Sequence, residues 1–205
     1  KLLEEAFEAV KFGEARPRDA AEVRRTAQHE GGHALLYWLA GWCPSYVTVV
    51  SRGNHGGYMA RCAEEIEKRG CMTKEQLLAD IRVSLAGRAA EIMCYGPEAG
   101  LTTGASADLE NATQQARAMV CRYGMEDDFG LIVTPELMKY EGAMSSPVYL
   151  KVNEIAGRIL REQMSRTLEQ LTQYRPAFDT MVDELVAKER LTADDLRRIY
   201  PVKPA

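Results

Sequence analysis

The residues best suited to chemistry lie in one stretch, His29-Glu30-Gly31-Gly32-His33. Residues four apart on a helix share a face, so the imidazoles of His29 and His33 could bind one ion. Neutral imidazole is a good ligand for Zn²⁺. Glu30 is offset by one position and lies beside the ion, where it can take a proton from a water that the metal acidifies. This pattern on a helix is typical of a zinc peptidase.

The motif requires a helix, and the apolar residues around it recur at helical spacing from about residue 19 to 40. Gly31 and Gly32 each cost about 1 kcal/mol relative to Ala in a helix interior. Local rules tend to be broken at functional sites, and glycine lets another element approach the backbone closely. We therefore predict a helix over 19–40 that has a close neighbour at the two glycines.

The remaining sequence predicts a mainly α fold with a small β element beside the motif helix. Helices are expected over residues 2–12, 73–95, 106–123, 147–173 and 176–188, and Thr192 caps a last short one. Strands are expected over 46–50 and 58–61, and the apolar residues 131–133 are a weaker candidate. We read 1–205 as one domain, with the motif and third-ligand helices in 19–123 and a C-terminal helical part in 147–200.

Composition excludes several classes of function. The net charge of −4 and the absence of a basic stripe argue against nucleic-acid binding. No apolar run approaches the length of about 18 residues that would span a bilayer. The five cysteines form no C-x-x-C pair, which fits reduced thiols better than a disulfide framework. No Walker A pattern occurs, so this chain cannot hydrolyse ATP by that route.

A catalytic zinc takes three protein ligands and keeps one position open for water. No further histidine follows at metzincin spacing, and His55 lies in a glycine-rich loop where a histidine is more often simply exposed. Two carboxylates remain. Glu91 lies in an apolar helix, where it is costly without a partner, and Asp108 lies in a helix's first turn, where the dipole already favours an acid. Spacing alone leaves both open.

Four segments, in order along the chain, resemble the peptidase domain of the FtsH family of membrane-bound AAA+ zinc proteases. They are residues 26–34, 85–91, 101–110 and 123–125, and the most specific after the zinc motif is Thr102-Thr103-Gly104-Ala105-Ser106-Ala107-Asp108-Leu109. The resemblance implies that His29, His33 and Asp108 are the zinc ligands and that Glu30 is the catalytic base. It also implies that Glu91 supports a ligating histidine.

The resemblance also implies a biological setting. It implies an endopeptidase that degrades unfolded or membrane proteins, coupled to an AAA+ ATPase module outside this sequence. It further implies a homohexameric ring and a cytoplasmic-facing domain that is attached to a membrane through segments outside this sequence. The strand over 46–50 could pair with an extended substrate by β-augmentation.

A proteolytically weak or inactive zinc-binding hexamer scaffold is the alternative function. Structural zinc sites are usually four-ligand and rich in cysteine, which this site is not. The intact Glu30 favours the enzyme, because a scaffold has no use for a general base.

Overall fold

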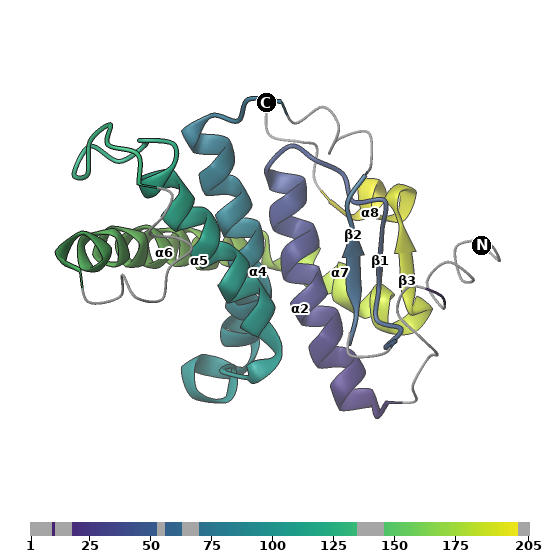
Figure 1. Cartoon of the computed structure of the whole chain (residues 1–205). Coiled ribbons are helices and arrows are strands. Elements are labelled where there is room, and N and C mark those ends of the chain that lie inside the picture. The colour runs from purple at the N-terminus through teal and green to yellow at the C-terminus, as the bar shows by residue number, and fades with distance from the viewer. Residues whose placement is uncertain (1–9, 11–17, 53–55, 63–69, 135–145, 201–205) are drawn as a thin grey trace.

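The computed structural model describes residues 10, 18–52, 56–62, 70–134 and 146–200. Helix α2 (Ala20–Leu39) runs through the middle, with α4 (Lys74–Ala99) and α5 (Ser106–Cys121) on one side and a small sheet on the other (Figure 1). Helix α6 (Pro147–Gln173) packs across α4 and α5, while α7 (Arg175–Lys188) packs against α2. A short helix, α8 (Ala193–Ile199), follows. The predicted mainly α fold is confirmed.

The sheet has three antiparallel strands in the order β2-β1-β3. Strands β1 (Tyr46–Thr48) and β2 (Tyr58–Ala60) are the predicted β element beside the motif helix. Strand β3 (Arg190–Thr192) was not predicted, since three residues between two helices carry no alternating pattern. Because β1 pairs with β2 on one side and β3 on the other, the prediction that residues 46–50 pair with a substrate is wrong.

The predicted helix boundaries agree closely with the structure, apart from one turn of α4. Gly96 has φ 83° and ψ 171°, so the helix breaks there as predicted, but one further turn continues to Ala99. The candidate strand at 131–133 is wrong, because these residues pair with no strand of the described chain and Leu131 is 87% exposed. The predicted helix over 2–12 falls outside the described residues, apart from residue 10. No helix among the described residues is long and apolar enough to cross a membrane.

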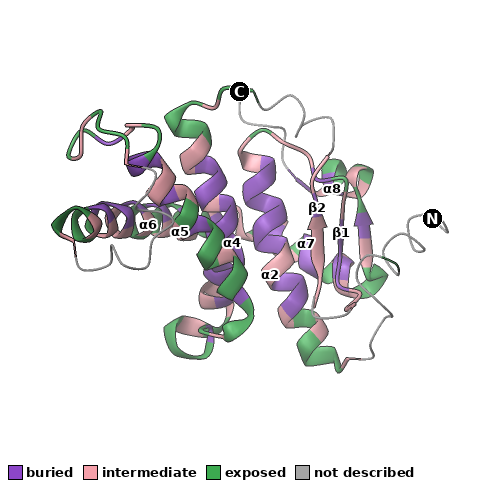
Figure 2. Ribbon diagram, in the orientation of Figure 1, coloured by how far each residue is buried: buried purple, intermediate pink, exposed green. Residues whose placement is uncertain are grey.

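Two buried clusters meet at α4. The first surrounds α2, which is buried along most of its length (Figure 2), and includes Leu35, Phe178 and Leu191. The second joins α4 to α5 and α6 and includes Ile81 and Ile155. Because α4 contributes to both clusters, it fixes the motif helix relative to the C-terminal helices.

The two glycines of the motif lie where neighbouring helices come closest to α2. A Cβ at Gly32 would lie 2.4 Å from the carbonyl oxygen of Ala86 in α4. A Cβ at Gly31 would lie 2.5 Å from the terminal methyl of Met181 in α7. The close approach that the glycines predicted is therefore confirmed on both sides of the helix.

The two glycines should differ in how well they tolerate alanine. Gly32→Ala places a methyl against backbone and should lower the free energy of unfolding by about 1–3 kcal/mol or more. Gly31→Ala meets side chains and no backbone: its closest contact is the flexible end of Met181, and Phe178 follows at 3.3 Å. The gain of about 1 kcal/mol in helix propensity offsets much of that cost. Urea unfolding of the metal-free variants measures the difference. Equal stability of Gly32→Ala and wild type would contradict this packing.

Candidate metal centre

Three of the predicted site residues meet at one point between α2 and α5. The Nε2 atoms of His29 and His33 lie 3.1 Å apart. Oδ2 of Asp108 lies 3.1 Å from the first and 3.4 Å from the second. Tetrahedral ligands at zinc–ligand distances of 2.0–2.1 Å would be about 3.3 Å apart. The donor set and its spacing therefore fit a zinc ion, and these three form the one cluster of metal-binding type among the described residues.

The other nitrogen of each imidazole is held by α4. Nδ1 of His33 lies 2.7 Å from the carbonyl oxygen of Val83, and Nδ1 of His29 lies 2.7 Å from Oε1 of Glu91. A carbonyl oxygen can only accept, so Nδ1 of His33 carries the proton and donates it. In the neutral ring the lone pair then lies on Nε2, which faces the cluster. Such outer partners orient metal-binding histidines and raise their basicity.

The two candidate carboxylates occupy different places. Asp108 lies in the first turn of α5 and faces the Nε2 atoms of both histidines. Glu91 lies in the interior of α4, is 2% exposed, and faces Nδ1 of His29. Burial raises the pKa of Glu91, but hydrogen bonds from His29 and Thr102 outweigh it and keep that pKa below its usual value. This arrangement favours Asp108 as a ligand and Glu91 as its supporting neighbour.

The electrostatics of the metal-free site are those of a site prepared for a cation. Burial lowers the pKa of His29, but the hydrogen bonds with Asp108 and Glu91 and the charge of Glu30 outweigh it and raise the pKa to about 10. Burial raises the pKa of Asp108, and its hydrogen bonds with His29 and His33 overcome this and lower it well below the usual range. Asp108 is thus ionised, and a metal ion would have to displace the proton from His29 in order to bind there.

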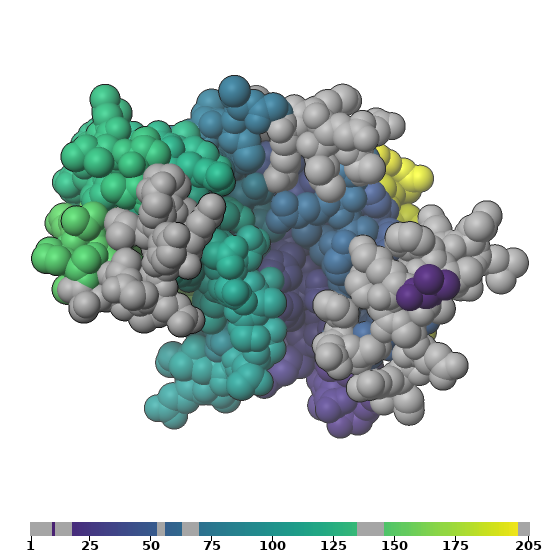
Figure 3. All heavy atoms as spheres, in the orientation of Figure 1, coloured from purple at the N-terminus to yellow at the C-terminus, as the bar shows by residue number. Residues whose placement is uncertain are grey.

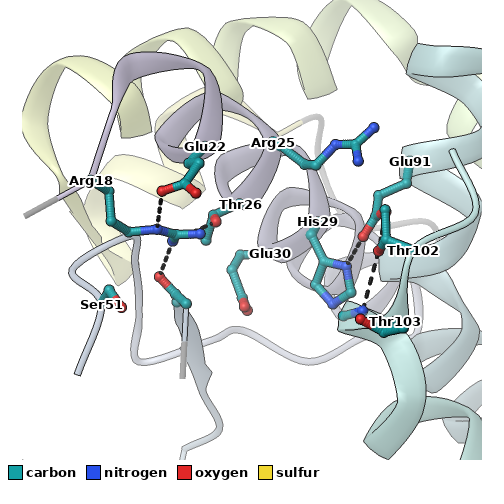
Figure 4. A pocket seen from close by; sticks show the side chains of 13 residues that line it. Arg18, Glu22, Arg25, Thr26, His29, Glu30, Ser51, Glu91, Thr102 and Thr103 are labelled. Carbon is teal, nitrogen blue, oxygen red and sulfur yellow. Dashed lines mark hydrogen bonds and ion pairs between the residues drawn. The ribbon is translucent and has the colours of Figure 1, made fainter. Parts of the chain in front are cut away.

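Glu30 lies beside the cluster, at the wall shared by two cavities. The smaller, of about 470 Å³, reaches from the cluster to β2 and α5, and the larger, of about 830 Å³, extends toward the start of α2. In Figure 3, α2 (purple) lies at the floor of the hollow between the teal helices and the blue β segment. Figure 4 shows Glu91 and Thr102 on one side of the His29 ring and Glu30 on the other.

Sequence reasoning missed two residues of the site. A Cβ at Gly87 in α4 would lie 2.4 Å from Nε2 of His29, so this glycine makes room for the ring. Its signal was available, since Gly87 interrupts an apolar helix just as the motif glycines do. Thr102 donates a hydrogen bond to Glu91, and no spacing rule could have paired a loop residue with that carboxylate. His55 falls outside the described residues.

Comparison with known proteins agrees with this geometry. The model of peptidase family M41 matches residues 17–199. A Mycobacterium tuberculosis protein named ATP-dependent zinc metalloprotease FtsH is 33% identical over 212 residues, which cover 97% of this chain and 27% of the relative. The Thermus thermophilus protein of the same name is 33% identical over 218 residues, covering 100% of this chain and 34% of the relative.

The chain thus spans about a quarter to a third of the length of these curated relatives. The resemblance found in the four sequence segments is confirmed over nearly the whole chain, and the relatives' names agree with the expected enzyme class and with Zn²⁺ as its cofactor. The chain belongs to peptidase family M41, the family of the FtsH zinc metalloproteases.

Proposed function

We propose that this chain is the zinc-dependent endopeptidase domain of an ATP-dependent protease. The observation that carries the proposal is the triangle formed by two Nε2 atoms and one carboxylate oxygen, with Glu30 beside it. Three protein ligands leave a fourth position for water, as in catalytic zinc sites. The family match supports the same class of reaction.

In this proposal each residue has a separate task. His29, His33 and Asp108 hold the ion, which when bound lowers the pKa of a water and polarises the scissile carbonyl. Glu30 accepts the proton of the attacking water and passes it to the leaving amine. Glu91 and the Val83 carbonyl keep both Nε2 atoms turned toward the cluster.

The substrates we propose are unfolded or membrane polypeptides that enter in extended form. The smaller cavity is lined by Tyr58 and Met59 of β2, an edge strand of the three-stranded sheet. An extended peptide lying along this edge would be bound mainly through its backbone, so cleavage would depend weakly on sequence. We therefore propose that β2, and not residues 46–50, is the strand that pairs with the substrate.

The wider assembly is also a proposal. The relatives' name supports coupling to an ATPase module outside this sequence, and the resemblance to the FtsH family supports a homohexamer on the cytoplasmic face of a membrane. A single domain over 1–205 is supported by α4, which shares one core cluster with α2 and another with α6. The alternative, a zinc-binding scaffold without proteolysis, predicts no role for Glu30.

Replacing the proposed base separates these two functions. Glu30→Gln leaves the three proposed ligands in place, so the variant should keep zinc but lose casein turnover by at least about 10²-fold. Zinc content by atomic absorption and casein cleavage by wild type and variant are the two measurements. Undiminished cleavage by Glu30→Gln would contradict the assigned base, and zinc-loaded wild type without any cleavage would favour the scaffold.

The two carboxylates should differ in how strongly they affect zinc retention. Asp108→Ala removes a proposed ligand and should abolish stable binding. Glu91→Gln removes the partner of a ligand and should weaken affinity by about 10–100-fold. Dialysis against a graded series of chelators measures both. Loss of zinc from Glu91→Gln together with retention by Asp108→Ala would invert the assignment.

His29 should remain protonated in the metal-free protein at neutral pH. Its pKa is raised to about 10, against about 6.5 in an unfolded chain. The resulting stabilisation is present below pH 6.5 and is lost as the pH rises toward 10. An NMR titration of the imidazole protons from pH 5 to 9 should show His29 without a midpoint, and Glu91→Gln should lower its pKa. A midpoint near 6.5 in the wild type would refute the shift.

A further inference from the structure

The loop before α5 contacts the candidate metal centre through Glu91, which lies on the Nδ1 side of the His29 ring. We propose that Thr102 is a positioning residue: its hydroxyl sets the plane of the Glu91 carboxylate and ties that carboxylate to the loop that leads to Asp108. This inference rests on the proposed zinc site and assigns a task to a residue outside the ligands and the base.

A continuous chain of hydrogen bonds runs from the loop to His29 (Figure 4). The hydroxyl of Thr102 lies 2.9 Å from Oε2 of Glu91, and because a carboxylate only accepts, the hydroxyl donates. Its lone pair is then free to accept from the backbone N–H of Gly104, at 3.2 Å. The second oxygen of Glu91 accepts from Nδ1 of His29 at 2.7 Å. Each oxygen of the carboxylate therefore has its own donor.

Two anchors are needed because the last torsion of a glutamate side chain is broad. The bond to His29 alone fixes one oxygen of Glu91 and leaves the carboxylate plane free to turn. The bond from Thr102 fixes the other oxygen and so the plane. Since Glu91 is 2% exposed, water is poorly placed to replace a lost donor. Without the Thr102 donor the Glu91 carboxylate would turn, and the His29 ring that it holds would be less well oriented.

Thr102 is itself held from α4. The guanidinium of Arg88, 9% exposed and one turn before Glu91, donates to the carbonyl oxygen of Thr102. Helix α4 thus contacts both the backbone and the side chain of Thr102. The chain then continues through a 3₁₀ turn (Thr103–Ala105) into α5, which carries Asp108. A shift of Thr102 would therefore reach two ligands, His29 through Glu91 and Asp108 through the turn.

The test measures the zinc affinity of the whole chain by competition with a chromophoric chelator. Thr102→Val keeps the shape of the side chain and removes the donor, so it should weaken affinity by about tenfold. Thr102→Ser restores the donor and should stay within about twofold of wild type. Thr103→Val changes the exposed neighbour as a matched control and should also leave affinity unchanged. Wild-type affinity in Thr102→Val, or failure of Thr102→Ser to restore it, would overturn the proposal.

A double-mutant cycle separates positioning from capping, because Thr102 also caps the 3₁₀ turn. In a Glu91→Ala background the carboxylate is gone, so Thr102→Val should change zinc affinity by less than about twofold. A pure capping role would persist in that background, and an undiminished effect there would overturn the inference. Wild-type protein that binds no zinc would instead show that the proposed function itself is wrong, and the inference would fall with it.

Discussion

The face-to-face contact of α2 with α4 is the constraint on which the metal centre depends. His29 and His33 are spaced four apart on α2, and Val83, Gly87 and Glu91 are spaced four apart on the facing side of α4. Val83 and Glu91 each hold one imidazole by its Nδ1 atom, and the missing side chain of Gly87 leaves room for the ring of His29. The distance between the two helices therefore sets the orientation of both rings.

The third corner of the centre is supplied by a different route. Asp108 reaches the histidines from the first turn of α5, which follows a turn anchored to α4 through Arg88 and Thr102. On the opposite side, Gly57, the residue before β2, comes so close to Glu30 that an added Cβ would lie 2.9 Å from its Cγ. The side chain of Glu30, the proposed base, is thus packed between α2 and a backbone segment, and it lines the two cavities beside the cluster.

The sequence predicted correctly the features that depend on residues close to one another along the chain. The i,i+4 histidines, the motif glycines and the capped start of α4 at Thr73 depend only on nearby residues, and the structure places them as expected. The central position of β1 and the existence of β3 depend on a partner more than 140 residues away. Asp108 and Glu91 could not be separated by spacing, because each suits its own helix and only the packing of α4 and α5 around α2 decides which nitrogen each one faces.

The proposed zinc site is tested most directly by a crystal structure of the zinc-loaded chain, with anomalous diffraction collected on both sides of the zinc edge. A zinc ion held as proposed should give one strong anomalous peak within about 2.0–2.2 Å of Nε2 of both histidines and of a carboxylate oxygen of Asp108. Glu91 should remain on Nδ1 of His29, away from the ion. A peak bound to Glu91 with Asp108 turned away, or one that lies elsewhere on the chain, would contradict it.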